Sequence, residues 1–296
     1  MRILTEPNFD LTASCVLVPT MGSLHAGHES LLKLACSESN RRGVPAAATV
    51  FVNPTQFNEA TDFDRYPRDL DRDAEVCERC GIDVVFAPSP EIVYPPGEQI
   101  PTPELPAVAT EPGLEDTFRP GHFPGVCQVV SRCFDLCDAS AAIFGEKDWQ
   151  QLQVVRAMAE GQQASRGRLI EIVPGSTVRE PEGLAMSSRN LLLTAEARAE
   201  AVGISTALTE SAQEPDRDRA EAVLQSALRR AGIAFEYAVL RDAKSLLVPG
   251  PMSHPDGPNS PCRLLVAARV GGVRLIDNMP WLGHQPQGES NLDWSL

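Results

Sequence analysis

Two histidines stand three positions apart in the stretch "PTMGSLHAGH", which directly follows an apolar run that begins at Cys15. Gly22 and Gly27 beside them permit a tight turn and let a bulky ligand approach the backbone closely. A helix that begins near Gly27 would direct its free N–H groups and the positive end of its dipole toward the same place. Because the rings of His25 and His28 can also donate hydrogen bonds to phosphate oxygens, the stretch predicts an anion site suited to a nucleotide.

Two other interpretations of the histidine pair stay open. The rings could be ordinary core or surface histidines, or they could be half of a zinc site. Zinc is less favoured because no carboxylate or third ligand follows at a recognised spacing, and we assign no metal ligand to a protein side chain. The stretch matches neither of the common glycine-rich phosphate loops, G-x-x-x-x-G-K-[ST] and G-x-G-x-x-G.

Two further polar clusters carry groups that bind anions, hydroxyls or carboxylates. "FGEKDWQQL" supplies Lys147, a compact cation for a polyphosphate, and then Asp148, which could cap a helix or contact a ribose. "FVNPTQF" offers the uncharged amides of Asn53 and Gln56, which could bind hydroxyls and a carboxylate without repelling either. The polar run over residues 57–70 is typical either of a mobile cover over a site or of an ordinary surface loop.

The elements that must position these clusters are indicated by the hydrophobic pattern. Over roughly the first 175 residues, short apolar runs without strict alternation are separated by helical patterns, which predicts an α/β fold with a Rossmann-like parallel sheet and helices on both faces. Ligands of such sheets bind beyond the carboxyl ends of the strands. The polar clusters directly follow "CVLVPTM", "AAATVFVN" and "AAIFG", so we expect all three to meet at one edge.

The pattern divides the chain into a Rossmann-like domain over residues 1–182 and a smaller C-terminal α+β domain over 183–296. The second domain is expected to contain two helices and three strands, with "GLAMSSRN" at its start. Residues 88–120 are rich in proline and acidic side chains, and we expect a long excursion with one short strand. The polar tail after Trp281 is expected to be loosely held.

Composition excludes several classes of protein. The net charge of −14 over 296 residues argues against a nucleic-acid surface, and no apolar run approaches the roughly 20 residues that cross a bilayer. No secretory signal is visible, so a cytoplasmic location with eight reduced cysteines is expected. The pairs Cys77/Cys80 and Cys133/Cys137 lie in helical patterns and are interpreted as structural cysteines rather than metal ligands.

The pattern H-x-G-H resembles the HIGH element of class I aminoacyl-tRNA synthetases and related nucleotidyl transferases, which couple an acid to the α-phosphate of ATP. These enzymes pair that element with a second phosphate loop of the form K-M-S-K-S. "GLAMSSRN" fits this role, because Ser187 and Ser188 supply hydroxyls and Arg189 supplies a planar cation that donates two hydrogen bonds to phosphate. Taken alone, the same segment would be an ordinary capping or loop segment.

The sequence as a whole resembles the pantothenate synthetases (pantoate–β-alanine ligases). Six stretches carry the resemblance in family order over roughly residues 15–280: "PTMGSLHAGH", "FVNPTQF", "RPGHFPGV", "FGEKDWQQL", "GLAMSSRN" and "RLIDNM". The resemblance implies that ATP and pantoate form pantoyl adenylate and pyrophosphate, and that β-alanine then displaces AMP to give pantothenate. It also implies Mg²⁺ with the ATP phosphates, and a homodimer.

The resemblance implies roles for residues at the matching positions. His28 would be the catalytic proton donor, and His25 would contact the phosphates. Gln56 and Gln151 would bind pantoate, and Gln56 would also meet β-alanine. The ATP site would comprise Met21, Gly22, Ser23, Leu24, His25, Ala26, Gly27, His28, Gly145, Glu146, Lys147, Asp148, Val178, Met186, Ser187, Ser188 and Arg189. Arg119 and His122 match a family stretch and receive no role.

Three competing interpretations remain. Another adenylyltransferase of the same superfamily would be shorter and would lack "FVNPTQF" and the C-terminal domain. A catalytically inactive nucleotide-binding relative would have a damaged phosphate cluster, and the sequence contains none. An acidic interaction protein that uses its proline-rich segment would leave the polar clusters at the strand ends unexplained.

Overall fold

The computed structural model describes residues 1–6, 14–56, 63, 66–250 and 261–283. These residues form two units: unit 1 comprises Met1–Glu146 with Gln150–Ser176, and unit 2 comprises Lys147–Trp149 with Thr177–Leu296. The boundary between the units is therefore at Thr177, whereas the predicted boundary between domains is at residue 183. The division into domains at residues 182/183 stays a prediction.

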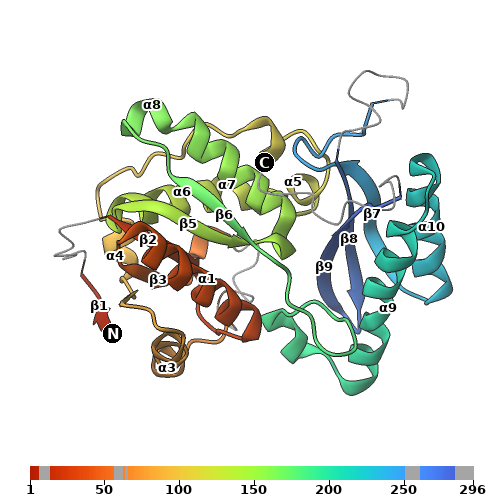
Figure 1. The fold of residues 1–296 in the computed structure, drawn as a ribbon, viewed down its shortest axis with the longest axis horizontal. Coiled ribbons are helices and arrows are strands. Elements are labelled where there is room, and N and C mark those ends of the chain that lie inside the picture. The colour runs from red at the N-terminus through yellow and green to blue at the C-terminus, as the bar shows by residue number, and fades with distance from the viewer. Residues whose placement is uncertain (7–13, 57–62, 64–65, 251–260, 284–296) are drawn as a thin grey trace. The chain divides into compact units, whose positions relative to one another are not determined.

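Unit 1 is built on a six-stranded sheet in the order β1-β4-β3-β2-β5-β6, and every pair of neighbouring strands is parallel (Figure 1). The strands are β1 (Arg2–Leu4), β2 (Cys15–Thr20), β3 (Ala46–Val50), β4 (Val84–Phe86), β5 (Ala139–Gly145) and β6 (Glu171–Gly175). The predicted parallel sheet is confirmed. The sequence did not indicate β1, because three residues at a sheet edge are too few to show a pattern.

Helices cover both faces of this sheet. They are α1 (Ala26–Arg42), α3 (Leu70–Cys80), α6 (His122–Leu136), α7 (Trp149–Gly161) and the short α8 (Gln163–Arg166). Leu32 of α1 and Val76 of α3 pack in one cluster with Val16 and Val18 of β2. Because side chains alternate along a strand, Leu17 faces the opposite side of the sheet, where α6 contacts β2 and β5.

The proline-rich segment over residues 88–120 contains no strand, so the predicted short strand is wrong. Three short helical turns occur instead: α4 (Pro90–Val93), η2 (Ala107–Ala109) and α5 (Glu115–Phe118). Proline fixes φ near the helical value and cannot donate to a sheet ladder, so it suits the first turn of a helix better than a strand. Pro90 occupies this position in α4.

Unit 2 is a three-stranded antiparallel sheet in the order β7-β8-β9, packed against two helices. Its elements are η4 (Ser188–Leu192), α9 (Ala195–Ala212), α10 (Arg217–Arg230), β7 (Ala234–Asp242), β8 (Cys262–Val270) and β9 (Val273–Pro280). Thr194 and Asp216 cap the two long helices with their side chains, as residues of these types commonly do. The predicted smaller α+β part is confirmed.

All eight cysteines are free thiols, and all except Cys36 and Cys80 are buried. Cys77, Cys133 and Cys137 are buried, whereas Cys80 is half-buried. Burial raises the pKa of the Cys77 and Cys133 thiols to about 12, which keeps them protonated at neutral pH. Among the helices that the structure describes, none is both long and apolar enough to span a bilayer.

Candidate active site

The carboxyl ends of three neighbouring strands carry the polar clusters of unit 1. Strand β2 lies between β3 and β5, and all three run in the same direction. The first histidine cluster therefore follows β2, "FVNPTQF" follows β3, and Glu146 follows β5 at one edge of the sheet. The chain passes from β2 to β3 and β4 on one side of β2 and then returns to β5 on its other side. Sheets of this kind bind ligands where the strand order reverses in this way. The expected placement of these clusters is confirmed.

A buried carboxylate holds the turn that follows β2. Asp73 of α3 is 1% exposed, and its two carboxylate oxygens accept hydrogen bonds from the backbone N–H groups of Ser23 at 2.9 Å and Leu24 at 2.8 Å. The turn needs this support because Gly22 and Ser23 both have positive φ, at 81° and 54°. A Cβ at Gly22 would lie 2.6 Å from Asp73 Oδ2, so only glycine fits there.

Sequence reasoning missed Asp73, although a signal for it existed. Asp73 lies on the same stripe of α3 as Val76 and Cys77, which are buried in the core. A charged residue on the apolar face of an amphipathic helix is unusual and marks a buried carboxylate with a specific partner.

The two histidines form a capping box at the start of α1. His25 is the N-cap residue, and its Nδ1 accepts a hydrogen bond from the Gly27 N–H at 3.1 Å. The His25 N–H donates in turn to Nδ1 of His28 at 3.3 Å, and the ring centroids lie 4.1 Å apart. The Gly27 N–H is thus engaged by the cap, which corrects the expectation that it is free for an anion.

This hydrogen-bonding pattern fixes the direction in which each neutral ring can donate. Because Nδ1 of both His25 and His28 accepts, the ring proton of the neutral form lies on Nε2. Nε2–H is therefore the group of the neutral His28 ring that can donate a hydrogen bond.

The amides of "FVNPTQF" have different surroundings. Asn53 is buried, and both polar atoms of its side-chain amide form hydrogen bonds within the protein. Nδ2 donates to the Gly125 carbonyl at 3.3 Å, and Oδ1 accepts from the Tyr94 hydroxyl at 2.8 Å. These contacts fix the Asn53 side chain within the protein, and the expected contact of Asn53 with a substrate stays a prediction. Gln56 ends the turn η1 (Pro54–Gln56) and is half-buried. The proposed cover is mostly outside the described residues, which omit 57–62, 64 and 65.

Other conspicuous polar side chains lie near these segments. His122 at the start of α6 has Nδ1 at 3.4 Å from the Gln56 carbonyl and Nε2 at 3.0 Å from Nη1 of Arg119. In α7, the buried Gln150 accepts from the Glu115 N–H at 2.9 Å, while its neighbour Gln151 is half-buried. Of these two glutamines, Gln151 is the one assigned to a substrate. Gln150 instead holds the backbone of Glu115.

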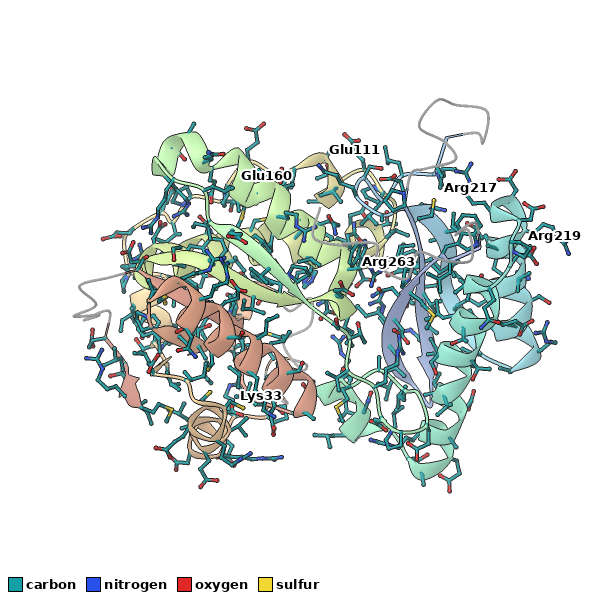
Figure 2. All side chains as sticks on the ribbon, in the orientation of Figure 1. Lys33, Glu111, Glu160, Arg217, Arg219 and Arg263 are labelled. Carbon is teal, nitrogen blue, oxygen red and sulfur yellow. The ribbon has the colours of Figure 1, made fainter. Side chains whose placement is uncertain are left out.

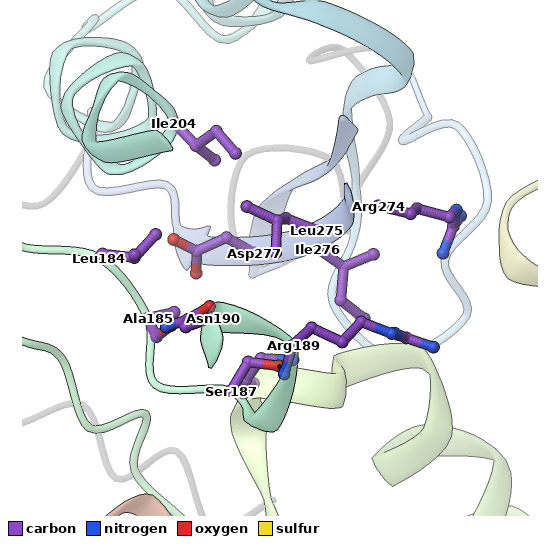
Figure 3. Close-up of a pocket in the computed structure, with 11 residues that line it drawn as sticks. Leu184, Ala185, Ser187, Arg189, Asn190, Ile204, Arg274, Leu275, Ile276 and Asp277 are labelled. Atoms are coloured by element: carbon purple, nitrogen blue, oxygen red, sulfur yellow. Dashed lines mark hydrogen bonds between the residues drawn. The ribbon is translucent and has the colours of Figure 1, made fainter. Parts of the chain in front are cut away.

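In unit 2, the predicted phosphate-binding residues gather around one pocket. Lys147, Ser187 and Arg189 line it together with Leu184 and Ala185, which belong to a hairpin over residues 178–186. Figure 3 shows Leu184, Ala185, Ser187 and Arg189 around this pocket. The hairpin closes with a hydrogen bond from the Met186 N–H to the Val178 carbonyl at 2.9 Å. Lys147 forms an ion pair with Asp148 at 3.3 Å, and its side chain is 18% exposed. The pocket is small, with room for about one water molecule, and Asp277 and the apolar side chains of Leu275 and Ile276 also line it. Two cations and a hydroxyl therefore lie around one concavity, and groups of these types bind phosphate.

Ser187 also has a local structural task. Its side chain accepts from the Arg189 N–H at 3.3 Å and caps the turn η4. Asn190 lies behind it, buried, and donates to the Ala185 carbonyl at 3.0 Å. The turn is thereby held against the hairpin, while Arg189 itself is exposed.

The described part of the chain contains no group of three or more histidine, cysteine, aspartate or glutamate side chains that could hold a metal ion. Mg²⁺ commonly keeps several water ligands and binds mainly through substrate phosphates, so it needs no protein cage. The residues present fit an ion that is bound by the phosphates of a nucleotide.

Comparison with known proteins identifies the family. The profile of the family described as pantoate-beta-alanine ligase matches residues 4–280, which is nearly the whole chain. The chain belongs to the pantoate-beta-alanine ligase family. Pantothenate synthetase of Nocardioides sp. is 46% identical over 93% of this chain and 81% of its own length. Pantothenate synthetase of Myxococcus xanthus is 43% identical over 92% and 90%.

Solved structures of the ligase family have the same fold. Pantothenate synthetase from Thermus thermophilus superposes with a TM-score of 0.82 at 36% identity, covering 94% of this chain and 99% of that chain. Pantoate-beta-alanine ligase from Francisella tularensis, solved in complex with Beta-gamma ATP and Beta-alanine, gives 0.73 at 29% identity over 95% and 97%. The parallel sheet with an appended antiparallel sheet is thus the family architecture.

Proposed function

We propose that the protein condenses pantoate with β-alanine at the expense of ATP and that the reaction passes through an enzyme-bound pantoyl adenylate. The pantoate carboxylate would attack the α-phosphate of ATP and release pyrophosphate. The amine of β-alanine would then attack the activated carbonyl and release AMP. The observation that carries this proposal is the family match over residues 4–280, which includes every cluster that the chemistry requires.

The first step sets the main electrostatic demand. A carboxylate that attacks a polyanion is repelled by it, so the site must offset the negative charge that develops in the transition state. We assign Lys147 and Arg189 to the phosphates, together with the hydroxyls of Ser187 and Ser188. The shared pocket of Lys147, Ser187 and Arg189 supports this assignment. Bound Mg²⁺ would supply further charge neutralisation.

We assign proton donation to His28. Its Nδ1 accepts a backbone hydrogen bond, so the exchangeable ring proton is on Nε2. His25 would bind phosphate oxygens through its own Nε2. The turn Met21–Gly27 would pack against the nucleotide with its backbone, as the glycine at position 22 allows. The remaining ATP contacts are Gly145, Glu146, Asp148, Val178 and Met186.

We assign Gln56 and Gln151 to pantoate, and Gln56 also to β-alanine. Both side chains are half-buried, so they have accessible surface, and neutral amides bind carboxylates and hydroxyls without adding charge. We further propose that the protein is a cytoplasmic homodimer. The free cysteines are consistent with a reducing compartment.

The family match over residues 4–280 favours this activity over the alternatives. It includes "FVNPTQF" and the C-terminal sheet, which a shorter adenylyltransferase would lack. An inactive relative is disfavoured because Lys147, Ser187 and Arg189 are all present and line one pocket.

The test measures AMP and pyrophosphate released from ATP with pantoate, with and without β-alanine. Sustained AMP release that needs both acids and Mg²⁺ is expected, with activity unchanged by a zinc-selective chelator. Turnover of ATP without pantoate, or with an unrelated acid in its place, would contradict the assignment.

A further inference from the structure

The motif "RLIDNM" contains two buried polar residues that the proposed chemistry does not use. Asp277 and Asn278 lie side by side in β9 and are 5% and 3% exposed. Burying a carboxylate and an amide is costly unless each is well hydrogen-bonded, so their partners indicate what the two residues do.

Asn278 holds the segment that carries Lys147. Its Nδ2 donates to the Lys147 carbonyl at 2.8 Å, and its Oδ1 accepts from Nε of Arg263 at 2.5 Å. The guanidinium of Arg263, which is labelled in Figure 2, stacks 3.5 Å above the ring of Trp149. Trp149 Nε1 donates in turn to the Ala243 carbonyl at 2.8 Å. The tripeptide from Lys147 to Trp149 is therefore fixed at both ends.

Asp277 holds the hairpin that leads to Arg189. Its two oxygens accept from Nη1 and Nη2 of Arg179 at 2.7 and 2.9 Å. Nη1 of Arg179 also donates to the Gly183 carbonyl at 3.0 Å, at the tip of the hairpin in which Arg179 pairs with Ala185. Asp277 itself lines the pocket that Lys147 and Arg189 share (Figure 3).

We propose that Asp277 and Asn278 are positioning residues that set the two phosphate-binding segments of unit 2 relative to each other from one rigid strand. Asn278 acts through the backbone of Lys147, and Asp277 acts through Arg179 on the segment Met186–Arg189. This inference rests on the proposed function, because it assumes that Lys147 and Arg189 bind ATP phosphates. One strand fixes the distance between the two segments more precisely than two independent loops would, because β9 is hydrogen-bonded to β8 along its length.

The variant Asn278→Asp tests this arrangement with little change in volume. It removes the Nδ2 donor to Lys147 and keeps an oxygen that accepts from Arg263. We expect kcat for pyrophosphate release to fall about 10- to 100-fold, with the KM for pantoate within about 2-fold. Asn278→Ala, which lacks the same donor, serves as the second variant if the aspartate form does not fold.

A double-mutant cycle with Lys147→Ala separates positioning from general stability. If Asn278 acts through Lys147, Asn278→Asp lowers kcat in the Lys147→Ala background by less than about 3-fold, because the group that it positions is already gone. The same loss in both backgrounds, or unchanged kcat in Asn278→Asp alone, overturns the inference. Unchanged kcat in Lys147→Ala alone instead overturns the proposed role of Lys147, and the inference with it.

Ser211→Ala provides a matched control. Ser211 is fully buried in the same unit and donates from its hydroxyl to the Ala220 carbonyl at 2.6 Å, between α9 and α10. It touches neither phosphate-binding segment. We expect a lower melting temperature with kcat unchanged. A fall in kcat that matches that of Asn278→Asp would show that any loss of stability in unit 2 lowers activity, and it would overturn the inference.

Discussion

Two of the segments assigned to the nucleotide, the turn after β2 and the hairpin that leads to Arg189, are each supported by a buried carboxylate. Asp73 accepts hydrogen bonds from two backbone N–H groups of the turn after β2. Asp277 instead forms a bidentate ion pair with Arg179, which then donates to the hairpin backbone. Asp73 therefore contacts the main chain of the first segment directly, whereas Asp277 reaches the main chain of the second through the side chain of Arg179.

This difference follows from the backbone conformation of the two segments. The turn after β2 contains consecutive residues with positive φ, which is sterically costly for Ser23 and must be offset by specific contacts. The hairpin before Arg189 contains a single residue with positive φ, Gly183, for which this conformation carries no steric cost. We expect substitutions in the first segment to lower activity more than stability. Substitution of Asp277 should lower stability as well as activity, because it also leaves Arg179 without its anion.

The largest effect is expected for His28. Replacement by glutamine keeps an acceptor at the N3 position for the His25 N–H, which is a common capping-box arrangement, but removes the ionisable ring. We expect kcat to fall by about two to four orders of magnitude while the protein stays folded, because an amide cannot transfer a proton. Circular dichroism and steady-state kinetics check this. Wild-type turnover in His28→Gln would reduce the role of the histidine to helix capping.

Exchange of each carboxylate for an amide compares the two supports directly. Asp73→Asn leaves one of two N–H donors facing an NH₂ group, and we expect kcat/KM for ATP to fall about 10- to 100-fold. Asp277→Asn leaves Arg179 without its anion in a largely buried pair, and we expect a loss of about 3 kcal/mol in unfolding free energy. Denaturant unfolding and ATP kinetics on both variants provide the measurements.

Asp69→Ala is the matched control on the same helix as Asp73. Asp69 caps α3 by accepting from the Arg72 N–H at 3.1 Å and does not touch the turn after β2. Asp69→Ala should lower the free energy of unfolding by about 1 kcal/mol, with no change in kcat. Equal losses of activity in Asp73→Asn and Asp277→Asn, with equal losses of stability, would remove the distinction between the two segments.

The smallest effects are expected at one glycine in each segment. Gly22→Ala would place Cβ 2.6 Å from Asp73 Oδ2, an atom fixed by its own hydrogen bond, whereas Gly183→Ala would place it 2.9 Å from the rotatable Ser205 hydroxyl. Both have positive φ, so each costs about 1–2 kcal/mol from backbone strain. Only Gly22→Ala should also lower kcat/KM for ATP, by about 10-fold. A larger kinetic defect in Gly183→Ala would reverse the comparison.

Much of the architecture was predictable from local pattern. Short apolar runs between helical patterns indicated the parallel sheet, and the cluster after each run indicated the binding edge. Gly43 ends the first long helix with φ of 67°, the conformation in which glycine commonly ends a helix. The segment over 88–120 was less predictable, because its prolines suit isolated turns and leave no periodicity to read.

The sequence predicted the residue types and motifs of the site, but it did not predict the hydrogen-bond partner of each side chain. Asn53 and Gln56 are both uncharged amides of one motif, yet only the structure shows that Asn53 is engaged at both ends of its side chain within the protein. Similarly, Gln150 and Gln151 are identical in type, and burial alone separates them.

The sequence by itself determined where strands and helices form and which clusters follow strand ends, since both depend on neighbours a few positions away. The tertiary structure decided which buried polar side chain supports which binding segment. Asp73 reaches Ser23 across 50 positions, and Asn278 reaches Lys147 across 131. Such pairs depend on how the chain returns to itself, because a buried polar group takes the partner that the fold brings within hydrogen-bond distance.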